Sequence, residues 1–197
     1  MKDILVFAKE ILLERMPVTG TFIDFTMGNG HDTLYFAQYL EQGHVYAFDI
    51  QPQAVENTRR LLKEYGVLHR ATLIHDSHSN VDKYVQGEID AGVFNLGYLP
   101  GSDKTVTTLS HTTLIALEKA VNMLKIGGVI VVVIYPGHGE GAKEAQLVEE
   151  FCAQLDKHTY NSYKYNLLNK KNPPYIVAVE RFVPANRYEG RVEGCQP

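Results

Sequence analysis

The sequence predicts an α/β fold: a doubly wound mixed sheet of seven strands with an antiparallel C-terminal hairpin strand. Three observations lead to this prediction. Apolar, strand-like runs alternate with helical patterns as far as residue 155, which is typical of right-handed β–α–β crossovers. The segment GVIVVVI at 128–134 is apolar throughout, as expected for a strand buried on both faces. Two further strand-like runs then follow each other closely, which predicts a hairpin.

The elements can be justified in order along the chain. A helix is expected at 3–15, where apolar residues recur at helical spacing before Pro17 and Gly20. Gly28 and Gly30 end the first strand, Pro52 opens a helix and Gly127 closes another. We expect strands at 21–25, 44–49, 71–75, 89–95, 128–134, 159–165 and 175–182, and further helices at 31–40, from 52 onward, within 78–86, at 106–124 and at 141–155.

Length and composition indicate a globular chain. With 197 residues, 45% hydrophobic and 21% charged, we expect a single domain over 1–197 and exclude a disordered chain, a coiled coil and a collagen. A net charge of -4 gives no global basic field, although a local basic face is compatible with it. Two cysteines exclude a disulfide framework and favour a cytoplasmic location. No apolar run is long enough for a signal peptide or a membrane span.

The residues that suggest a function fall mostly in five loops. These are 26–31, 49–51, 75–78, 95–104 and 135–141, each following a predicted strand or preceding a predicted helix. In a parallel sheet, such loops lie at the carboxyl ends of the strands, where ligands bind. The sequence therefore predicts a ligand site along this edge.

The first loop indicates a nucleotide-type cofactor. Gly28 and Gly30 allow the backbone a tight turn and a close approach to a ligand. Asp24 ends the first strand and Asp49 the second, and a carboxylate in the second position suits the hydroxyls of a ribose. A glycine pair alone is equally compatible with an ordinary strand-to-helix turn.

The neighbouring residues favour S-adenosylmethionine over a dinucleotide. Thr33 stands where a dinucleotide fingerprint has its third glycine, and Asp32 places a negative charge where a pyrophosphate would bind. Together with Asp24, this acidic surrounding suits a cationic cofactor that carries an amino group.

Several motifs also resemble a known family. FIDFTMGNGHDT and VYAFDIQ resemble motifs I and II of class I methyltransferases, which have a Rossmann-like fold. TMGNGHDT, HDSH, NLGYLPGSDK and YPGHGEG together resemble the bacterial MnmM (YtqB) family, first labelled rRNA methylases and including tRNA 5-(aminomethyl)-2-thiouridine methyltransferases. The resemblance extends from the first helix to NPPYIVAVERF and implies S-adenosylmethionine-dependent methylation of the aminomethyl group on a wobble uridine, in the tRNA anticodon stem-loop. It also implies a homodimer.

The resemblance assigns cofactor contacts position by position. It implies that the loop 27–30 surrounds the methionine part of the cofactor, with contacts from Met27, Gly28, Asn29 and Gly30. It also implies that Asp24 faces the amino group of the cofactor, that Asp49 accepts from its ribose hydroxyls and that Gln51 lies beside its adenine. Asp76, Ser77 and His78 would lie along the adenine, although a solvated loop is the alternative. His75 and His78 could suggest a metal, but no third ligand is identifiable, so we expect none.

The loop after the fourth strand is the candidate catalytic segment. Asn95 and nearby carbonyl oxygens can orient a target nitrogen, and Tyr98 can stack on a base or simply plug the end of the sheet. An alkylamine has a pKa of about 10.4 and reacts only when neutral, so a proton acceptor is expected. Asp32, Asp103 and His138 are the candidates; helix-end charge, helix cap and turn filler are their alternative roles.

The candidate RNA contacts lie mostly in the C-terminal third of the chain. These are Lys104, Lys170, Lys171, Tyr175, Arg187 and Arg191, and a solvated face is the alternative. A second motif, NPPY at 172–175, is interpreted as a hairpin turn away from the cofactor edge. Two other functions stay open: methylation of rRNA or of a small molecule, and nucleotide binding without catalysis.

Overall fold

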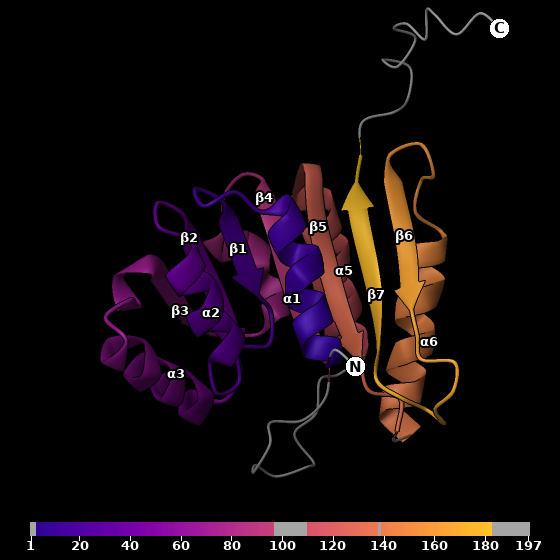
Figure 1. Ribbon diagram of the computed structural model, residues 1–197, viewed down its shortest axis with the longest axis horizontal. Helices are drawn as coiled ribbons and strands as arrows, with labels where there is room; N and C mark the ends of the chain where they lie inside the picture. Colours follow the sequence, from indigo (N-terminus) through magenta and orange to yellow (C-terminus); the bar gives the residue numbers. More distant parts are fainter. Residues whose placement is uncertain (1–2, 97–109, 138, 183–197) are drawn as a thin grey trace, which may run out of the picture.

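The computed structural model describes residues 3–96, 110–137 and 139–182. Its strands form one sheet in the order β3-β2-β1-β4-β5-β7-β6 (Figure 1). The strands are β1 (Thr21–Asp24), β2 (His44–Asp49), β3 (Ala71–His75), β4 (Ile89–Leu96), β5 (Leu124–Ile134), β6 (Tyr160–Tyr165) and β7 (Tyr175–Arg181). Strands β1 to β5 pair in parallel, and β7 pairs antiparallel with both β5 and β6. The predicted doubly wound mixed sheet is therefore confirmed.

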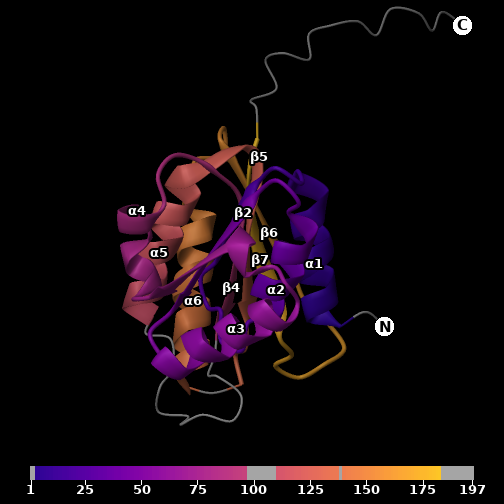
Figure 2. The ribbon, with the colours of Figure 1, turned by 90° about the vertical axis from the view of Figure 1, so that its left-hand side faces the viewer.

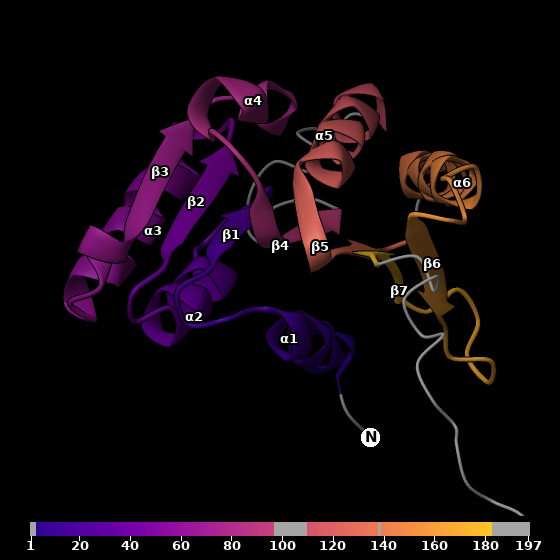
Figure 3. The ribbon, with the colours of Figure 1, turned by 90° about the horizontal axis from the view of Figure 1, so that it is seen from above.

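Helices cover both faces of the sheet. One layer holds α1 (Ile4–Arg15), α2 (His31–Tyr39) and α3 (Pro52–Glu64). The opposite layer holds α4 (Val81–Tyr84), α5 (Ser110–Met123) and α6 (Gly139–Ala153), as Figures 2 and 3 show. Short 3₁₀ turns lie at Leu68–Arg70 and His78–Asn80. In the part of the chain that the structure describes, no helix has the length and apolar character needed to cross a bilayer.

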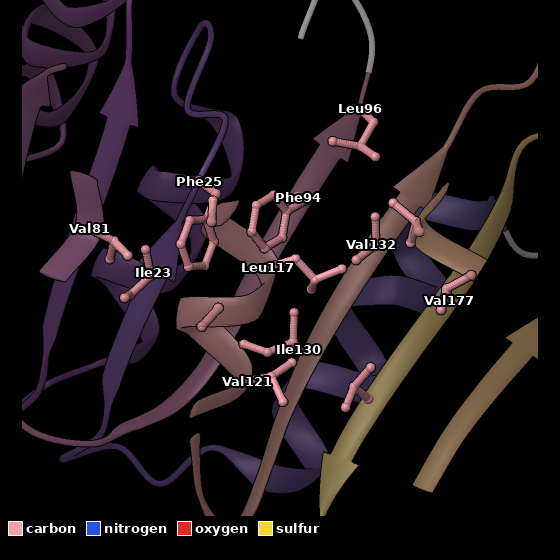
Figure 4. Close-up of a cluster of buried hydrophobic side chains, with 14 of the residues drawn as sticks. Ile23, Phe25, Val81, Phe94, Leu96, Leu117, Val121, Ile130, Val132 and Val177 are labelled. Carbon is pink, nitrogen blue, oxygen red and sulfur yellow. The ribbon is translucent and has the colours of Figure 1, made fainter. Parts of the chain in front are cut away.

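Each layer buries its own apolar core against the sheet. On the side of α4, α5 and α6, side chains of β1 and β4 meet helix side chains such as Val81 and Leu117 (Figure 4). Within this core the rings of Phe25 and Phe94 stack with centroids 4.0 Å apart. The other core joins α1, α2 and α3 to the opposite face of the same strands. Burial on both faces explains why the central strands read as continuous apolar runs.

Strand β5 begins earlier than the sequence predicts. It starts at Leu124, four residues before the expected 128, because Leu124 pairs with Ile89 ahead of a register shift between Ile89 and Ala91. Gly127 in this irregular stretch has φ +86°, a conformation that suits glycine. The glycine expected to end the helix therefore lies within the bulged start of the strand.

The NPPY segment lies at the edge where the sequence interpretation did not expect it. Because β7 runs antiparallel to β5, its first residue, Tyr175, pairs with Ile134, the last residue of β5. The connection between β6 and β7, which includes Lys170 and Lys171, therefore lies at the carboxyl edge of the parallel strands (Figure 1). The prediction that 172–175 lies away from the cofactor edge was therefore wrong. Because β7 runs antiparallel to β5, the turn that precedes β7 lies at the carboxyl edge of the parallel strands.

Candidate active site

Four polar residues mark the carboxyl edge of the central strands. Asp24 ends β1, Asp49 ends β2, Asn95 lies near the end of β4, and Tyr135 directly follows β5. The register places these strand ends side by side: Asp24 lies beside Ala47 and Val93, and Asn95 beside Val133. The edge predicted from the loops is therefore a single row of functional groups.

The glycine loop after β1 turns sharply over α2. Gly28 and Gly30 have φ +51° and +81°. A Cβ on Gly30 would approach Thr58 Oγ1 to 2.6 Å, so both conformation and close packing require glycine there. Thr58 Oγ1 donates to the carbonyl oxygen of Gly28 at 3.1 Å, which ties the loop to α3. Met27 is buried with only 3% exposure, and its side chain belongs to the core beneath the loop, so its contact with a cofactor stays a prediction.

Asp49 organises the loop from the neighbouring strand. Its Oδ2 accepts a hydrogen bond from the Gly28 N–H at 3.0 Å, and its Oδ1 accepts one from the Gln51 N–H at 2.9 Å. An ionised carboxylate has about four acceptor positions, so about two remain for further donors. Asp49 can therefore hold the loop and accept from the hydroxyls of a ribose at the same time.

Asp24 is an acid whose ionisation is disfavoured by its burial at this edge. It is 1% exposed, with Thr33 Oγ1 donating to its Oδ2 at 2.7 Å and the Thr26 N–H to its Oδ1 at 3.2 Å. Burial, and then the charges of Asp32 and Asp49, raise its pKa to about 7, although both hydrogen bonds oppose this shift. A cationic group beside Asp24 would relieve the cost of ionising it.

Two hydrogen bonds hold Asn95 in place. Its main-chain N–H donates to Thr26 Oγ1 at 2.8 Å, and its Nδ2 donates to Asp32 Oδ2 at 2.8 Å. Lys9 of α1 pairs with the other oxygen of Asp32 at 2.8 Å. Asn95 Oδ1 is buried and, among the described residues, has no hydrogen-bond partner. This arrangement presents a single free acceptor next to the glycine loop.

The segment 76–78 is more ordered than a solvated loop. Asp76 accepts from the Ser77 N–H, from Asn80 Nδ2 and from Tyr84 Oη, and the hydrogen bond from Tyr84 contributes most to lowering its pKa. Ser77 caps the following turn and contacts Ser79 Oγ at 2.8 Å. In the glycine loop, Asn29 Oδ1 accepts a hydrogen bond from Asn57 Nδ2 at 3.3 Å. The contacts of Asp76, Ser77, Asn29 and Gln51 with a cofactor stay predictions.

His78 has one free nitrogen in the interior. It is 8% exposed, and its Nδ1 lies 2.9 Å from the Phe25 carbonyl oxygen. Since a carbonyl can only accept, Nδ1 carries the proton and Nε2 is the bare acceptor. Burial lowers the pKa of His78, and Nε2 is a second buried atom without a partner in the described part of the chain.

The candidate RNA contacts differ in their surroundings. Lys170 and Lys171 are exposed, whereas Tyr175 is only 5% exposed. The hydroxyl of Tyr175 donates to Glu149 Oε1 at 2.5 Å, and Lys164 Nζ lies 4.6 Å from its ring centroid. Both the ring and the hydroxyl of Tyr175 are thus engaged within the protein, and its contact with tRNA stays a prediction. Several other predicted residues lie outside the described ones: Tyr98, Asp103, Lys104, His138, Arg187 and Arg191.

Sequence reasoning missed three residues at this edge. Lys9 lies in the middle of a helix, and only the fold brings it to Asp32. Thr26 looked like part of the glycine loop, but it links Asp24 to Asn95. Tyr135 is 37% exposed, and burial followed by the charges of Asp3 and Asp32 raises its pKa. The YPGHGEG motif was the available signal for Tyr135. Within 3–96, 110–137 and 139–182, no cluster of three or more potential metal ligands occurs.

Comparison with known sequences identifies related proteins. A family model described as "Putative rRNA methylase" matches residues 45–180. A chloroplastic tRNA (mnm(5)s(2)U34)-methyltransferase of Arabidopsis thaliana is 39% identical in an alignment of 168 residues that covers 80% of this chain. The matched region spans 61% of the length of that plant protein.

Comparison with solved structures gives full-length matches. A crystal structure described as a "putative rRNA-methylase" from Clostridium thermocellum superposes with a TM-score of 0.90 at 38% identity. A "putative methyltransferase" from Streptococcus mutans, in complex with SAH, superposes with a TM-score of 0.85 at 36% identity. Each comparison covers 92% of this chain and 99% of the other.

Proposed function

Because the chain belongs to the rRNA methylase family, whose model matches most of it, we propose that it is an S-adenosylmethionine-dependent tRNA methyltransferase. Its substrate is the aminomethyl group of 5-aminomethyl-2-thiouridine at the wobble position, and its product is 5-methylaminomethyl-2-thiouridine. The name of the Arabidopsis relative supports a tRNA wobble uridine over rRNA. A cytoplasmic location and a single domain belong to the same proposal.

The residues at the edge fit S-adenosylmethionine, whose demethylated form, SAH, occupies the Streptococcus mutans structure. Asp24 is a buried carboxyl whose ionisation a neighbouring cation would favour, and the cofactor carries an ammonium group. Asp49 retains acceptor capacity for ribose hydroxyls. A pyrophosphate would instead meet the charges of Asp24, Asp32 and Asp49.

The chain's part in the reaction is alignment and proton control. When bound, the cofactor supplies a methyl group on a positively charged sulfur, open to attack by the lone pair of a neutral amine. Asn95 Oδ1 accepts an N–H of that amine and thereby turns its lone pair toward the methyl group. Correct positioning alone can contribute roughly 7–11 kcal/mol to lowering a barrier. The methylated nitrogen then loses one proton, and the acceptor of that proton is predicted among Asp32, Asp103 and His138.

One observation carries this proposal: beside an acid-lined glycine loop, Asn95 Oδ1 is buried and has no hydrogen-bond partner within 3–96, 110–137 and 139–182. A buried acceptor without a partner costs about 1–3 kcal/mol, so the site is built for a donor that arrives with the substrate. A protein that only bound nucleotides would gain nothing from this cost.

RNA binding belongs to the same proposal. Lys170 and Lys171 are exposed in the connection between β6 and β7, at the edge that also holds the glycine loop. Positive charge at this place offers contacts to tRNA phosphates despite a net charge of -4.

We propose a homodimer as the second partner interaction. Exposed apolar side chains gather on α1 and β6: Leu5, Val6, Tyr163 and Tyr165. Tyr165 packs edge-on against Phe7 of α1, at 5.3 Å between centroids, which connects the two elements into one surface. Sedimentation of the protein at micromolar concentration tests this; a monomer throughout would contradict it.

Mass spectrometry of tRNA nucleosides tests the function directly. In a strain that lacks this gene, 5-aminomethyl-2-thiouridine should accumulate and its methylated form should disappear. The purified protein with S-adenosylmethionine should then methylate tRNA from that strain. Methylation of rRNA or of a free small molecule instead would establish the second candidate, which the family description favours.

A further inference from the structure

Three polar side chains from distant parts of the sequence form a line at the carboxyl edge. Lys9 comes from α1, Asp32 from the first turn of α2 and Asn95 from β4. Lys9 Nζ lies 2.8 Å from Asp32 Oδ1, and Asn95 Nδ2 donates to Asp32 Oδ2 at 2.8 Å. Each oxygen of Asp32 is thus engaged by a different donor.

The carboxylate of Asp32 decides which way the Asn95 amide faces. The two ends of an asparagine amide have nearly the same shape but opposite hydrogen-bonding character. An ionised carboxylate accepts and cannot donate, so it selects the NH₂ end. Turning the amide over would place Oδ1 against a carboxylate oxygen. The main chain at Asn95 is held independently by Thr26, so only the side-chain amide is left to be set.

The orientation has a direct consequence for the free acceptor. With Nδ2 directed to Asp32, Oδ1 must lie on the other side of the amide, where it is buried without a partner among the described residues. The reverse orientation would present two N–H donors to the substrate. Donors there would repel the N–H groups of an amine rather than accept from them.

Lys9 holds Asp32 in turn. Its ammonium group lies 4.8 Å from the ring centroid of Tyr35, so the lysine is positioned by α2 as well as by the ion pair. The side chains of Lys9 and Asp32 are 25% and 18% exposed, which makes the pair partly shielded from solvent. Helix α1 thereby contributes to a site whose other residues follow the strands.

We propose that the Lys9–Asp32 ion pair is a positioning unit that fixes the Asn95 amide with its oxygen toward the acceptor nitrogen. It acts through Asn95 and does not accept the substrate proton. The inference rests on the proposed function, and it replaces the proton-acceptor role that the sequence suggested for Asp32.

A double-mutant cycle tests the proposal. In single-turnover methylation of tRNA at saturating S-adenosylmethionine, Asp32→Asn should lower the rate by roughly 10- to 100-fold, and Lys9→Met by about 10-fold or less. Because the cofactor is saturating, a change in cofactor affinity on loss of the Asp32 charge does not enter this rate. In an Asn95→Ala background, Asp32→Asn should cause no further loss, since residues that act as one unit are not additive.

Arg15→Met is the matched control. Arg15 lies on the same helix and also forms an ion pair, with Glu180 at 2.8 Å, but not with any residue of the edge. Its rate should stay within about twofold of the wild type. Two outcomes would show that Asp32 acts on the substrate itself and would overturn the proposal. One is an equal loss of rate from Asp32→Asn in the wild type and in Asn95→Ala. The other is a methylation rate that falls at low pH in the wild type but no longer does so in Asp32→Asn.

A readout without catalysis separates this inference from the proposed function. In ¹⁵N spectra of the free protein, the Asn95 side-chain NH₂ should be protected from exchange with water, and Lys9→Met and Asp32→Asn should each speed that exchange. The signal is assigned by its loss in Asn95→Ala. Unprotected NH₂ protons in the wild type would overturn the positioning role, whereas protected ones in a protein that methylates no tRNA would overturn only the proposed function.

Discussion

The two halves of the sheet treat their polar groups in opposite ways. At the carboxyl edge of β1, β2 and β4, Asp24 is buried with a raised pKa, and Asn95 Oδ1 has no hydrogen-bond partner in the part of the chain that the structure describes. In the β7–β6 half, Glu149 accepts from both Lys164 Nζ at 2.7 Å and the Tyr175 hydroxyl, which lower its pKa against the effect of burial. At the carboxyl edge of the first half, buried polar groups thus destabilise the folded protein. In the second half, the carboxylate of Glu149 is paired with neighbouring donors.

This difference separates residues that bind from residues that stabilise. Of three buried side-chain atoms without partners in the described residues, two, Asn95 Oδ1 and His78 Nε2, come from this edge. Buried polar groups are normally satisfied, so such exceptions indicate where a ligand completes the structure. Substitutions at the edge should therefore change activity or affinity, and substitutions in the β7–β6 half should change stability.

The largest expected effect is on turnover. Asn95→Ala should lower kcat by roughly 100-fold or more, the scale seen when one preorganised hydrogen-bonding group is removed. Cofactor affinity should change little, because the amide faces the acceptor nitrogen. Steady-state kinetics with tRNA and calorimetry with S-adenosylmethionine give the two numbers. Equal losses in both would place Asn95 in cofactor binding instead.

Asp49 should dominate cofactor affinity. Asp49→Ala removes acceptors for the ribose and the bonds that hold Gly28 and Gln51, so binding should weaken by roughly 1.5–3 kcal/mol. Titration calorimetry with S-adenosylmethionine measures this. Unchanged affinity would remove the ribose assignment, and tight binding of NAD by the wild type would contradict the cofactor itself.

Asp24 should make cofactor binding dependent on pH. With a pKa of about 7, the carboxyl is mostly protonated at pH 6 and mostly ionised at pH 8. Binding of an ammonium group should therefore be about tenfold tighter at pH 8 than at pH 6, and Asp24→Asn should abolish this dependence. Fluorescence or calorimetric titrations across this range provide the measurement.

The same group predicts the opposite slope for folding. Between the ordinary value of 3.8 and about 7, the folded protein keeps a proton that the unfolded chain has lost. Stability contributed by this group is thus present at low pH and is lost as the pH rises through 7. Urea unfolding at pH 5.5 and pH 8 should show a smaller difference for Asp24→Asn than for the wild type. A larger difference would exclude Asp24 as the source.

Lys170 and Lys171 test whether the second half also takes part in binding. Replacing both by alanine should weaken tRNA binding and reduce the slope of log K against log salt by about 2, one for each lost phosphate contact. Both lie at the carboxyl edge but well beyond β4, so calorimetry with S-adenosylmethionine should give wild-type values. An unchanged salt slope would assign the two lysines to plain solvent-exposed surface.

The smallest effect is expected at Tyr175. Tyr175→Phe removes one hydrogen bond to Glu149, which keeps its bond from Lys164, so the free energy of unfolding should fall by about 1 kcal/mol. Tyr163→Phe is the control, because the Tyr163 hydroxyl is exposed and lies 3.3 Å from Glu180. Chemical unfolding compares the two. A loss of tRNA affinity without a loss of stability would instead establish Tyr175 as an RNA contact.

The strands and helices of the sheet could be predicted from the sequence because hydrophobic periodicity and glycine boundaries are local properties of the chain. It also located Asp24, Asp49 and Asn95 at one edge, since the ends of parallel strands coincide. It could not predict the edge at which 172–175 lies, because this depends on the direction of β7 relative to β5. It missed Lys9 for a similar reason: the contact with Asp32 arises from how α1 packs on the sheet.

The reversed direction of β7 also determines how the protein can be handled. β7 ends at Arg181, beside the amino ends of the parallel strands, whereas α1 begins near the active edge, where Asp3 influences Tyr135 (Figure 1). A fluorophore or surface tether attached at the end of β7 would thus lie on the side opposite the active edge. One attached at the start of α1 would lie beside that edge. The end of β7 is therefore the attachment point that leaves the active edge accessible to a large RNA.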